Sequence, residues 1–128
     1  MADGWTQLVQ AQLIQTGKVI KGAICGMDGT LWGISEGFSI SPEECQSAAR
    51  GFTNAQSVLG SGLKFEGEKY FVLQADDERI MGKKQSRGFF IYKTKQAVII
   101  AIYGDGVQPE QCSKVTGALA DYFKSIGY

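Results

Sequence analysis

The stretch AVIIAIY, residues 97–103, is apolar throughout. Its length and its β-branched residues predict a strand. A strand without a polar face has to be covered on both sides. We therefore expect residues 97–103 to form a central strand, with helices packed against both faces of its sheet.

Strand patterns precede this central segment, and short turn-like links separate them. They span residues 63–66, 69–75, 80–84 and 88–95. Strands joined by such short links pair as an antiparallel meander. Earlier in the chain, residues 19–26 and 30–35 are expected to form a hairpin across Asp28-Gly29, because both turn residues tolerate positive φ.

One helix start is encoded in Ser41-Pro42-Glu43-Glu44. Ser41 can cap the helix, Pro42 suits its first turn, and Glu44 completes a capping box. This helix is expected to reach about residue 52. A shorter helix or turn follows at residues 54–59.

Both ends of the chain have helical spacing. The first helix is predicted from Trp5 to about residue 15, with Asp3 as its cap and Gly17 at its end. The last begins near Pro109. Its apolar residues recur at intervals of three and four: Val115, Ala118, Leu119, Tyr122, Phe123 and Ile126. The predicted fold is α+β, with a central antiparallel β-sheet.

Length and composition favour one domain over residues 1–128, since 44% of the residues are apolar. No signal peptide and no apolar run of about 18 residues is present, so a soluble cytoplasmic protein is expected. Cys25, Cys45 and Cys112 are odd in number and widely spaced, which fits reduced thiols that are packed or partly exposed.

The sequence contains no histidine. This excludes histidine-dependent triads and most mixed Cys/His metal sites. Asp76, Asp77 and Glu78 fit a turn between strands better than a catalytic group. No glycine-rich phosphate loop is present. We expect a protein that is not an enzyme and needs no metal or cofactor.

Basic residues are concentrated between residues 79 and 95, a segment without any acidic residue. They are Arg79, Lys83, Lys84, Arg87, Lys93 and Lys95. The rest of the chain has seven basic against thirteen acidic residues, so a basic patch on an acidic body is expected. An acidic protein or an anionic membrane fits this patch, and nucleic acid fits it less well. A solvated, lysine-rich hairpin is the alternative.

Large aromatic residues lie near both chain ends and on the early hairpin. They are Trp5, Trp32, Tyr122, Phe123 and Tyr128. Each alone could be a core residue. Five further phenylalanines, however, are available to fill the core: Phe52, Phe65, Phe71, Phe89 and Phe90. The surplus predicts an aromatic surface on which a polyproline II segment can stack.

Taken together, the chain resembles the profilin family over its whole length. The resemblance rests on Trp5, on AICGMDGTLW (residues 23–32), on IMGKK (80–84), on KTKQA (93–97) and on the ending LADYF with Gly127-Tyr128. It implies an antiparallel sheet with the terminal helices on one face and smaller helices on the other. It also implies a cytoplasmic, cytoskeletal monomer that binds monomeric actin, proline-rich proteins such as actin elongation factors, and phosphatidylinositol 4,5-bisphosphate at membranes.

The resemblance assigns roles to residues of this chain. The matching proline-binding residues are Trp5, Trp32, Tyr122, Phe123 and Tyr128. The matching actin-binding residues are Arg79, Lys83, Lys84, Arg87, Val107, Gln108 and Lys114. The matching phosphoinositide region contains Arg79, Lys83, Lys84, Arg87, Lys93 and Lys95. Many relatives have tyrosine where this chain has Leu8, which predicts weaker proline binding.

Two other classes of function compete with this assignment. A trafficking or signalling adaptor can share a similar helix-sheet-helix build. It would have no use for solvent-facing Trp5, Trp32 and Tyr128. A cysteine-dependent enzyme would need a thiol of low pKa without any histidine.

Overall fold

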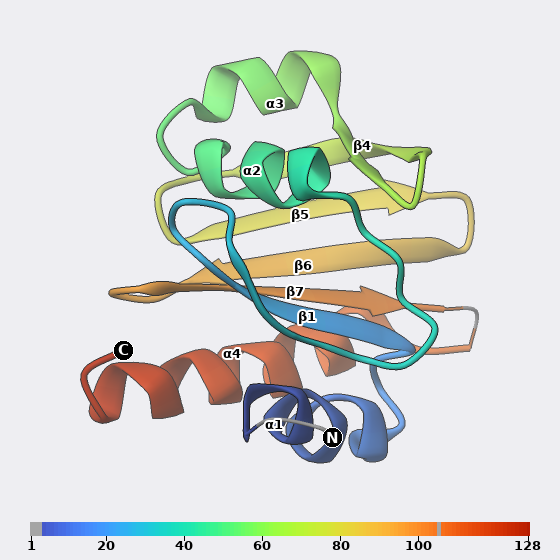
Figure 1. Ribbon diagram of the computed structural model, residues 1–128. Coiled ribbons are helices and arrows are strands. Elements are labelled where there is room, and N and C mark those ends of the chain that lie inside the picture. Colours follow the sequence, from blue (N-terminus) through green and yellow to red (C-terminus); the bar gives the residue numbers. More distant parts are fainter. Residues whose placement is uncertain (1–3, 105) are drawn as a thin grey trace.

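A seven-stranded antiparallel sheet separates two layers of helices in the computed structural model, which describes residues 4–104 and 106–128 (Figure 1). The strands are β1 Lys21–Gly26, β2 Leu31–Ile34, β3 Leu63–Phe65, β4 Glu68–Ala75, β5 Arg79–Lys84, β6 Arg87–Lys93 and β7 Ala97–Tyr103. The helices are α1 Gly4–Gln12, the 3-10 helix η1 Ile14–Thr16, α2 Pro42–Arg50, α3 Ala55–Ser61 and α4 Pro109–Ser125. The order β2-β1-β7-β6-β5-β4-β3 confirms the predicted meander and hairpin.

Strand β7 is buried along its whole length, as its sequence predicts. Successive side chains of a strand point to opposite faces. Val98, Ile100 and Ile102 accordingly enter the core beneath α2 and α3. Ile99 and Ala101 enter the core beneath α1 and α4. One apolar segment therefore supports both hydrophobic cores.

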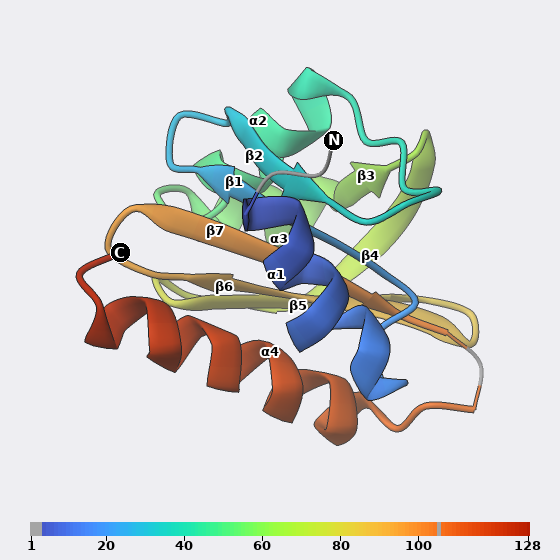
Figure 2. The same cartoon turned by 60° about the horizontal axis from the view of Figure 1, so that its bottom comes forward.

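The terminal helices α1 and α4 lie on the same face of the sheet (Figure 2). Val9 and Leu13 from the N-terminal segment and Leu119 and Phe123 from α4 are all buried there. Helix α1 packs on β1 and β2, and α4 packs on β6 and β7. This arrangement brings α1 and the residues after α4 close enough to share a surface.

Helix α2 begins as the sequence predicts. The Ser41 hydroxyl accepts a hydrogen bond from the Glu44 N–H at 3.2 Å, and the Glu44 carboxylate accepts one from the Ser41 N–H at 3.0 Å. The end differs, because the helix stops at Arg50 and not near residue 52. The predicted Asp3 cap lies outside the described residues. Gly17 ends the first helical segment with φ 76°, after its last turn has tightened into η1.

The turn between β6 and β7 shortens one predicted strand. The Thr94 N–H donates to the Ala97 carbonyl at 2.9 Å, and the Thr94 hydroxyl accepts from the Ala97 N–H at 3.0 Å. Strand β6 therefore ends at Lys93, and Lys95 lies in the turn.

All three cysteines are free and buried, so they are packing residues and none is a partly exposed thiol. The neighbouring Cys45 thiol and burial both raise the pKa of Cys25. Burial raises the pKa of Cys112 to about 12. These two environments disfavour the thiolate that cysteine catalysis requires.

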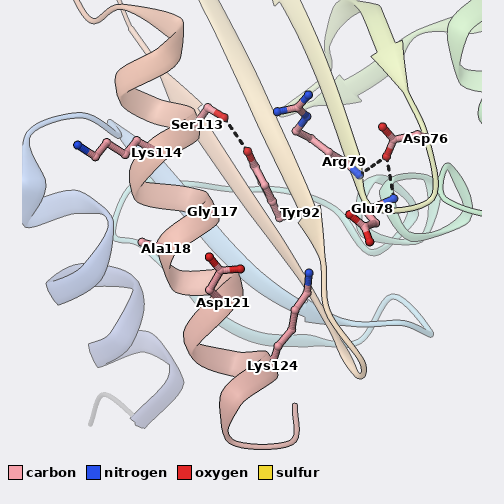
Figure 3. Close-up of a pocket in the computed structure, with 10 residues that line it drawn as sticks. All are labelled: Asp76, Glu78, Arg79, Tyr92, Ser113, Lys114, Gly117, Ala118, Asp121 and Lys124. Atoms are coloured by element: carbon pink, nitrogen blue, oxygen red, sulfur yellow. Dashed lines mark hydrogen bonds between the residues drawn. The ribbon is translucent and has the colours of Figure 1, made fainter.

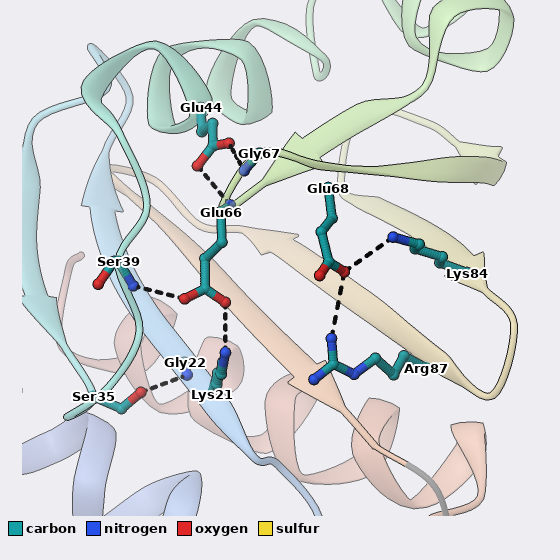
Figure 4. A network of polar contacts seen from close by, with 10 residues as sticks. All are labelled: Lys21, Gly22, Ser35, Ser39, Glu44, Glu66, Gly67, Glu68, Lys84 and Arg87. Atoms are coloured by element: carbon teal, nitrogen blue, oxygen red, sulfur yellow. Dashed lines mark hydrogen bonds and ion pairs between the residues drawn. The ribbon is translucent and has the colours of Figure 1, made fainter.

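A polar network joins α2 to the turn between β3 and β4 (Figure 4). The Glu44 carboxylate accepts the backbone N–H groups of Glu66 and Gly67, each at 2.8 Å. The Glu66 carboxylate in turn accepts Lys21 Nζ at 2.6 Å and the Ser39 N–H at 3.1 Å. Through Lys21, this network also reaches β1.

Replacing Glu66 with glutamine is expected to destabilise the protein at neutral pH and to have less effect in acid. Burial raises the pKa of Glu66, but the contacts with Lys21 and Ser39 lower it more, so it lies below the ordinary value of 4.5. A carboxyl with a lowered folded-state pKa stabilises the protein above its unfolded pKa and loses that effect as pH falls through the folded value. Urea titrations of both proteins between pH 7 and pH 3 should show the difference shrinking below pH ~4.5. A gap that stays constant over this range would contradict the assignment.

Candidate functional site

Three rings pack together where α1, β2 and the residues after α4 meet. The Trp5 ring centroid lies 4.8 Å from that of Trp32 and 5.2 Å from that of Tyr128. Trp32 and Tyr128 are 6.2 Å apart. We call Trp5, Trp32 and Tyr128 the aromatic cluster. It combines α1, β2 and the residues after α4, which are far apart in sequence.

Two glycines allow the tryptophan rings to lie where they do. A Cβ atom at Gly33 would approach the Trp5 carbonyl carbon to 2.6 Å and the Thr6 nitrogen to 2.7 Å. Glycine at this position therefore lets the backbone of α1 rest directly on β2. At Gly26 a Cβ atom would meet the Trp32 ring at 3.0 Å.

The last residues are held in place by hydrogen bonds to the β6–β7 turn. The Thr94 hydroxyl donates to the main-chain oxygen of Tyr128 at 2.7 Å, and the Gln96 side chain donates to the Gly127 carbonyl at 3.2 Å. The Tyr128 N–H also donates to the Phe123 carbonyl at 2.8 Å. These contacts position the Tyr128 ring against Trp5.

The predicted proline-binding residues differ in their access to solvent. Trp5 and Trp32 are half-buried, and Tyr128 is 36% exposed. Phe123 is completely buried, with its ring edge-on to Trp5 at 5.7 Å. Phe123 thus supports the cluster from below. Tyr122 is 50% exposed and lies beside the cluster, on the groove between α1 and α4.

Changing Gly33 to alanine is expected to weaken both folding and proline binding. The added methyl group would meet the backbone of Trp5 and Thr6, so α1 has to shift. Such overpacking costs about 1–3 kcal/mol. Gly60→Ala is the matched control, because a Cβ atom at Gly60 meets nothing within 4 Å. Denaturant unfolding and decaproline titration should show a loss of stability and of affinity only for Gly33→Ala. Wild-type stability and affinity in Gly33→Ala would contradict the close packing of α1 on β2.

The six basic residues of segment 79–95 do not form one patch. Strand alternation places Arg79 and Lys83 on the sheet face that carries α4, and Lys84 and Arg87 on the opposite face. Lys84 and Arg87 contact the Glu68 carboxylate at 3.1 and 3.4 Å (Figure 4). Lys93 and Lys95 lie at the end of the β5–β6 hairpin that is farther from the turn between Lys84 and Arg87. The predicted single basic patch is therefore wrong.

A groove of about 610 Å³ separates α4 from the ends of β5 and β6 (Figure 3). Arg79, Lys114 and Lys124 line it, together with Asp76, Glu78 and Asp121. The Tyr92 and Ser113 hydroxyl groups are hydrogen-bonded across it at 2.6 Å. Asp76 accepts the N–H groups of Glu78 and Arg79 at 2.8 and 2.7 Å, which confirms the predicted turn. The fold thus brings two predicted actin-binding residues, Arg79 and Lys114, to one groove.

The remaining predicted actin-binding residues lie at the start of α4. Val107 is half-buried against the core under α1 and α4. Gln108 is the N-cap of α4 and is exposed. Both lie on the same side of the sheet as Lys114.

Sequence reasoning missed two exposed apolar residues on β4. Phe71 was expected in the core, but it is 67% exposed, and Leu73 is 57% exposed. Phe71 pairs with Lys83, and Lys69 lies 5.9 Å above the Phe71 ring. We call Lys69, Phe71, Leu73 and Lys83 the β4–β5 face. It lies beyond the part of the sheet on which α4 packs.

Comparison with known proteins identifies the family. The profilin family model matches residues 3–128. This chain belongs to the profilin family. Profilins bind monomeric actin, proline-rich segments and phosphoinositides and regulate actin polymerisation, and this chain shares that function.

Individual relatives agree with this membership. Profilin-3 of Caenorhabditis elegans is 55% identical over 124 residues, covering 97% of this chain and 98% of that protein. Profilin of Branchiostoma belcheri is 39% identical over 118 residues, covering 92% and 94% of the two chains. The structure of Acanthamoeba castellanii profilin IA superposes with a TM-score of 0.94 at 37% identity, over 98% of this chain and all of that one.

As predicted, the terminal helices lie on one face of the sheet and the smaller helices on the other (Figure 1). The matching profilin structure confirms this fold. Among residues 4–104 and 106–128, no helix is both long and apolar enough to cross a membrane.

Proposed function

We propose that the aromatic cluster, together with Tyr122, is the surface of this profilin that binds proline-rich segments. The packing of Trp5, Trp32 and Tyr128 at ring separations of 4.8 to 6.2 Å carries this proposal. Prolines stack on such rings, and the indole N–H and phenol groups can donate to proline carbonyls, which have no N–H partners of their own. Phe123 contributes by supporting Trp5.

A related structure supports this assignment through its fold. Mouse profilin IIa, in complex with a double repeat from the FH1 domain of mDia1, superposes with a TM-score of 0.80 at 19% identity. We propose that this chain takes proline-rich partners in the same way. From the family resemblance, Leu8 stands where many profilins have tyrosine. This profilin is therefore expected to bind plain polyproline with lower affinity than those relatives do.

The actin monomer is proposed to bind the β4–β5 face together with Arg79, Val107, Gln108 and Lys114. This surface has exposed apolar side chains at Phe71 and Leu73, with basic groups around them. An apolar centre with a charged rim is typical of protein interfaces. Actin is acidic, so the surrounding lysines and Arg79 favour its approach. Lys84 and Arg87, on the opposite face, make a smaller contribution.

Phosphoinositides are proposed to bind at the two ends of the β5–β6 hairpin. Arg79, Lys93 and Lys95 form one end, and Lys83, Lys84 and Arg87 form the other. Each basic group near an anionic lipid surface contributes about 1 kcal/mol. Arg79 and Lys83 are shared with the actin surface, so lipid and actin are expected to compete.

One domain, residues 1–128, would then hold an actin monomer on one surface and a proline-rich segment on another. Holding both raises the effective concentration of actin near the proline-rich protein. This role belongs in the cytoplasm and at the cytoskeleton, and it requires no catalytic step. Separate calorimetric titrations with decaproline and with actin monomers test it. Each titration should show one-to-one binding. The absence of binding to either ligand would overturn the proposal.

A further inference from the structure

Two cysteines lie side by side between the sheet and α2. Cys25 is on β1 and Cys45 is near the start of α2, and both belong to the core beneath α2 and α3. Their thiols are neighbours, and Cys25 is placed to donate a hydrogen bond to Cys45. Two thiols that already interact need little backbone movement to form a disulfide. Cys112 has no part in this pair, because it lies in the core on the other side of the sheet.

A groove of about 340 Å³ at the surface gives access to Cys45. It lies between the β1–β2 turn and α2. Its lining comprises Asp28, Gly29, Thr30, Leu31, Ile40, Pro42, Cys45 and Gln46. Cys45 is only 2% exposed, and Cys25 is completely buried. A small uncharged oxidant can therefore reach Cys45 through the groove, whereas a thiol on another protein cannot.

The elements that carry the two thiols are fixed relative to one another. A Cβ atom at Gly29, where φ is 86°, would approach the Cα atom of Gln46 to 3.0 Å. Glycine thus lets the β1–β2 turn rest directly on α2. On the other side of α2, Glu44 accepts the N–H groups of Glu66 and Gly67. Cys45 lies between these two anchors in sequence, so its thiol stays next to that of Cys25.

The two thiols differ in their readiness to ionise. The Cys25 thiol, as a hydrogen-bond partner, lowers the pKa of Cys45, although burial and the Glu44 carboxylate oppose this effect. The pKa of Cys25 is raised, because Cys45 and burial both favour its neutral form. The thiolate is the nucleophilic form of cysteine. Cys45 is therefore the thiol that attacks an oxidant, and Cys25 is the thiol that reacts second.

We propose that Cys45 reacts with hydrogen peroxide and then forms a disulfide with Cys25, which ties α2 to β1. The Cys45 thiolate attacks one peroxide oxygen, the O–O bond breaks, and a sulfenic acid and hydroxide form. The hydroxide takes up the proton that Cys45 released. The Cys25 sulfur then attacks the Cys45 sulfur, the S–O bond breaks, and the hydroxide leaves as water with the Cys25 proton. Two thiols thus lose two electrons, and one hydrogen peroxide becomes two waters.

This disulfide would make the domain more resistant to unfolding. It closes a loop of about 20 residues and so restricts the unfolded chain. The loop contains the whole of β2. Because the thiols are already neighbours, the folded positions of β1 and α2 change little, and ligand binding is retained. A thiol reductant reverses the change.

The first test uses the unaltered chain. Treatment with excess hydrogen peroxide should lower its mass by about 2 Da, the two hydrogens lost from one pair of thiols. Cleavage after lysine and arginine releases both cysteines on residues 22–50, and cleavage after Glu36 cuts between them. After peroxide the two fragments should stay joined, and dithiothreitol should separate them.

The second test measures stability. The oxidised protein should unfold at a urea midpoint at least about 0.5 M above that of the reduced protein. Cys45→Ala should abolish both the mass loss and the shift of the midpoint. Cys112→Ala is the matched control, because it makes the same change at a buried cysteine in the opposite core. It should retain both effects.

Three results would overturn the inference. They are free thiols at both positions after peroxide, a sulfinic or sulfonic acid at Cys45 with Cys25 still reduced, and disulfide-linked dimers. Joined fragments without a rise in the urea midpoint would overturn the stabilising role. None of these results depends on decaproline or actin, so the proposed function stands or falls separately.

Discussion

Replacing Trp5 with alanine is expected to lower the affinity for decaproline at least about thirtyfold, because central aromatic residues contribute 2 kcal/mol or more to such interfaces. Trp5 contacts both other members of the aromatic cluster and also Phe123. Its removal would take away the ring that contacts both Trp32 and Tyr128. Calorimetric titration with decaproline measures the loss.

Phe71→Ala is the control for this experiment. Phe71 is an exposed ring on the β4–β5 face, away from the terminal helices. The Phe71→Ala variant should bind decaproline as the wild type does. The Trp5→Ala variant, in turn, should still bind actin monomers. Equal loss of decaproline binding in both variants would argue against the aromatic cluster as the site.

Changing Lys83 and Lys114 together to glutamine is expected to weaken actin binding about tenfold, mainly through slower association. Both residues are exposed on the side of the sheet that carries α4. Stopped-flow association at increasing salt should show the difference between variant and wild type shrinking, because salt screens exposed charges.

The double variant Lys84→Gln with Arg87→Gln removes the same net charge from the same segment. Both of its side chains contact Glu68 on the opposite face. Its association rate with actin should therefore change less than about twofold. If the two double variants slowed association equally, net charge and not a defined surface would explain the effect.

Local signals made much of the fold predictable. The capping box at Ser41 and Glu44 lies within four residues, and the structure shows both of its hydrogen bonds. The apolar segment 97–103 needs two covered faces, and both are present. Such features depend on few neighbours, so the sequence alone is enough to predict them.

The distribution of basic residues was predictable only in part. That Lys83 and Lys84 lie on opposite faces of β5 follows from the alternation of the predicted strand, and the expectation of one patch overlooked it. Which face each takes depends on the register with β6, and a turn at Gln85, with φ 56°, fixes that register. Gln85-Ser86 is not a favoured hairpin turn sequence, so the register was not evident.

The exposure of Phe71 has a tertiary cause. Strand β4 has apolar residues on both faces, so its pattern does not distinguish a covered face from an open one. Helix α4 packs on β6 and β7, which leaves the same face of β4 in contact with solvent. A bulge between Val72 and Gln74 further disturbs the alternation at Leu73. Only the packing of the whole domain shows that this surface is available to a partner.

The central claim is that proline-rich segments and actin bind separate surfaces of one domain. Titrating decaproline into the preformed complex with monomeric actin, by calorimetry, tests this most directly. The account predicts one-to-one binding with the affinity measured for the free protein, within about twofold, and no release of actin. Loss of decaproline binding in the complex, or displacement of actin by the peptide, would show that the two ligands share one site.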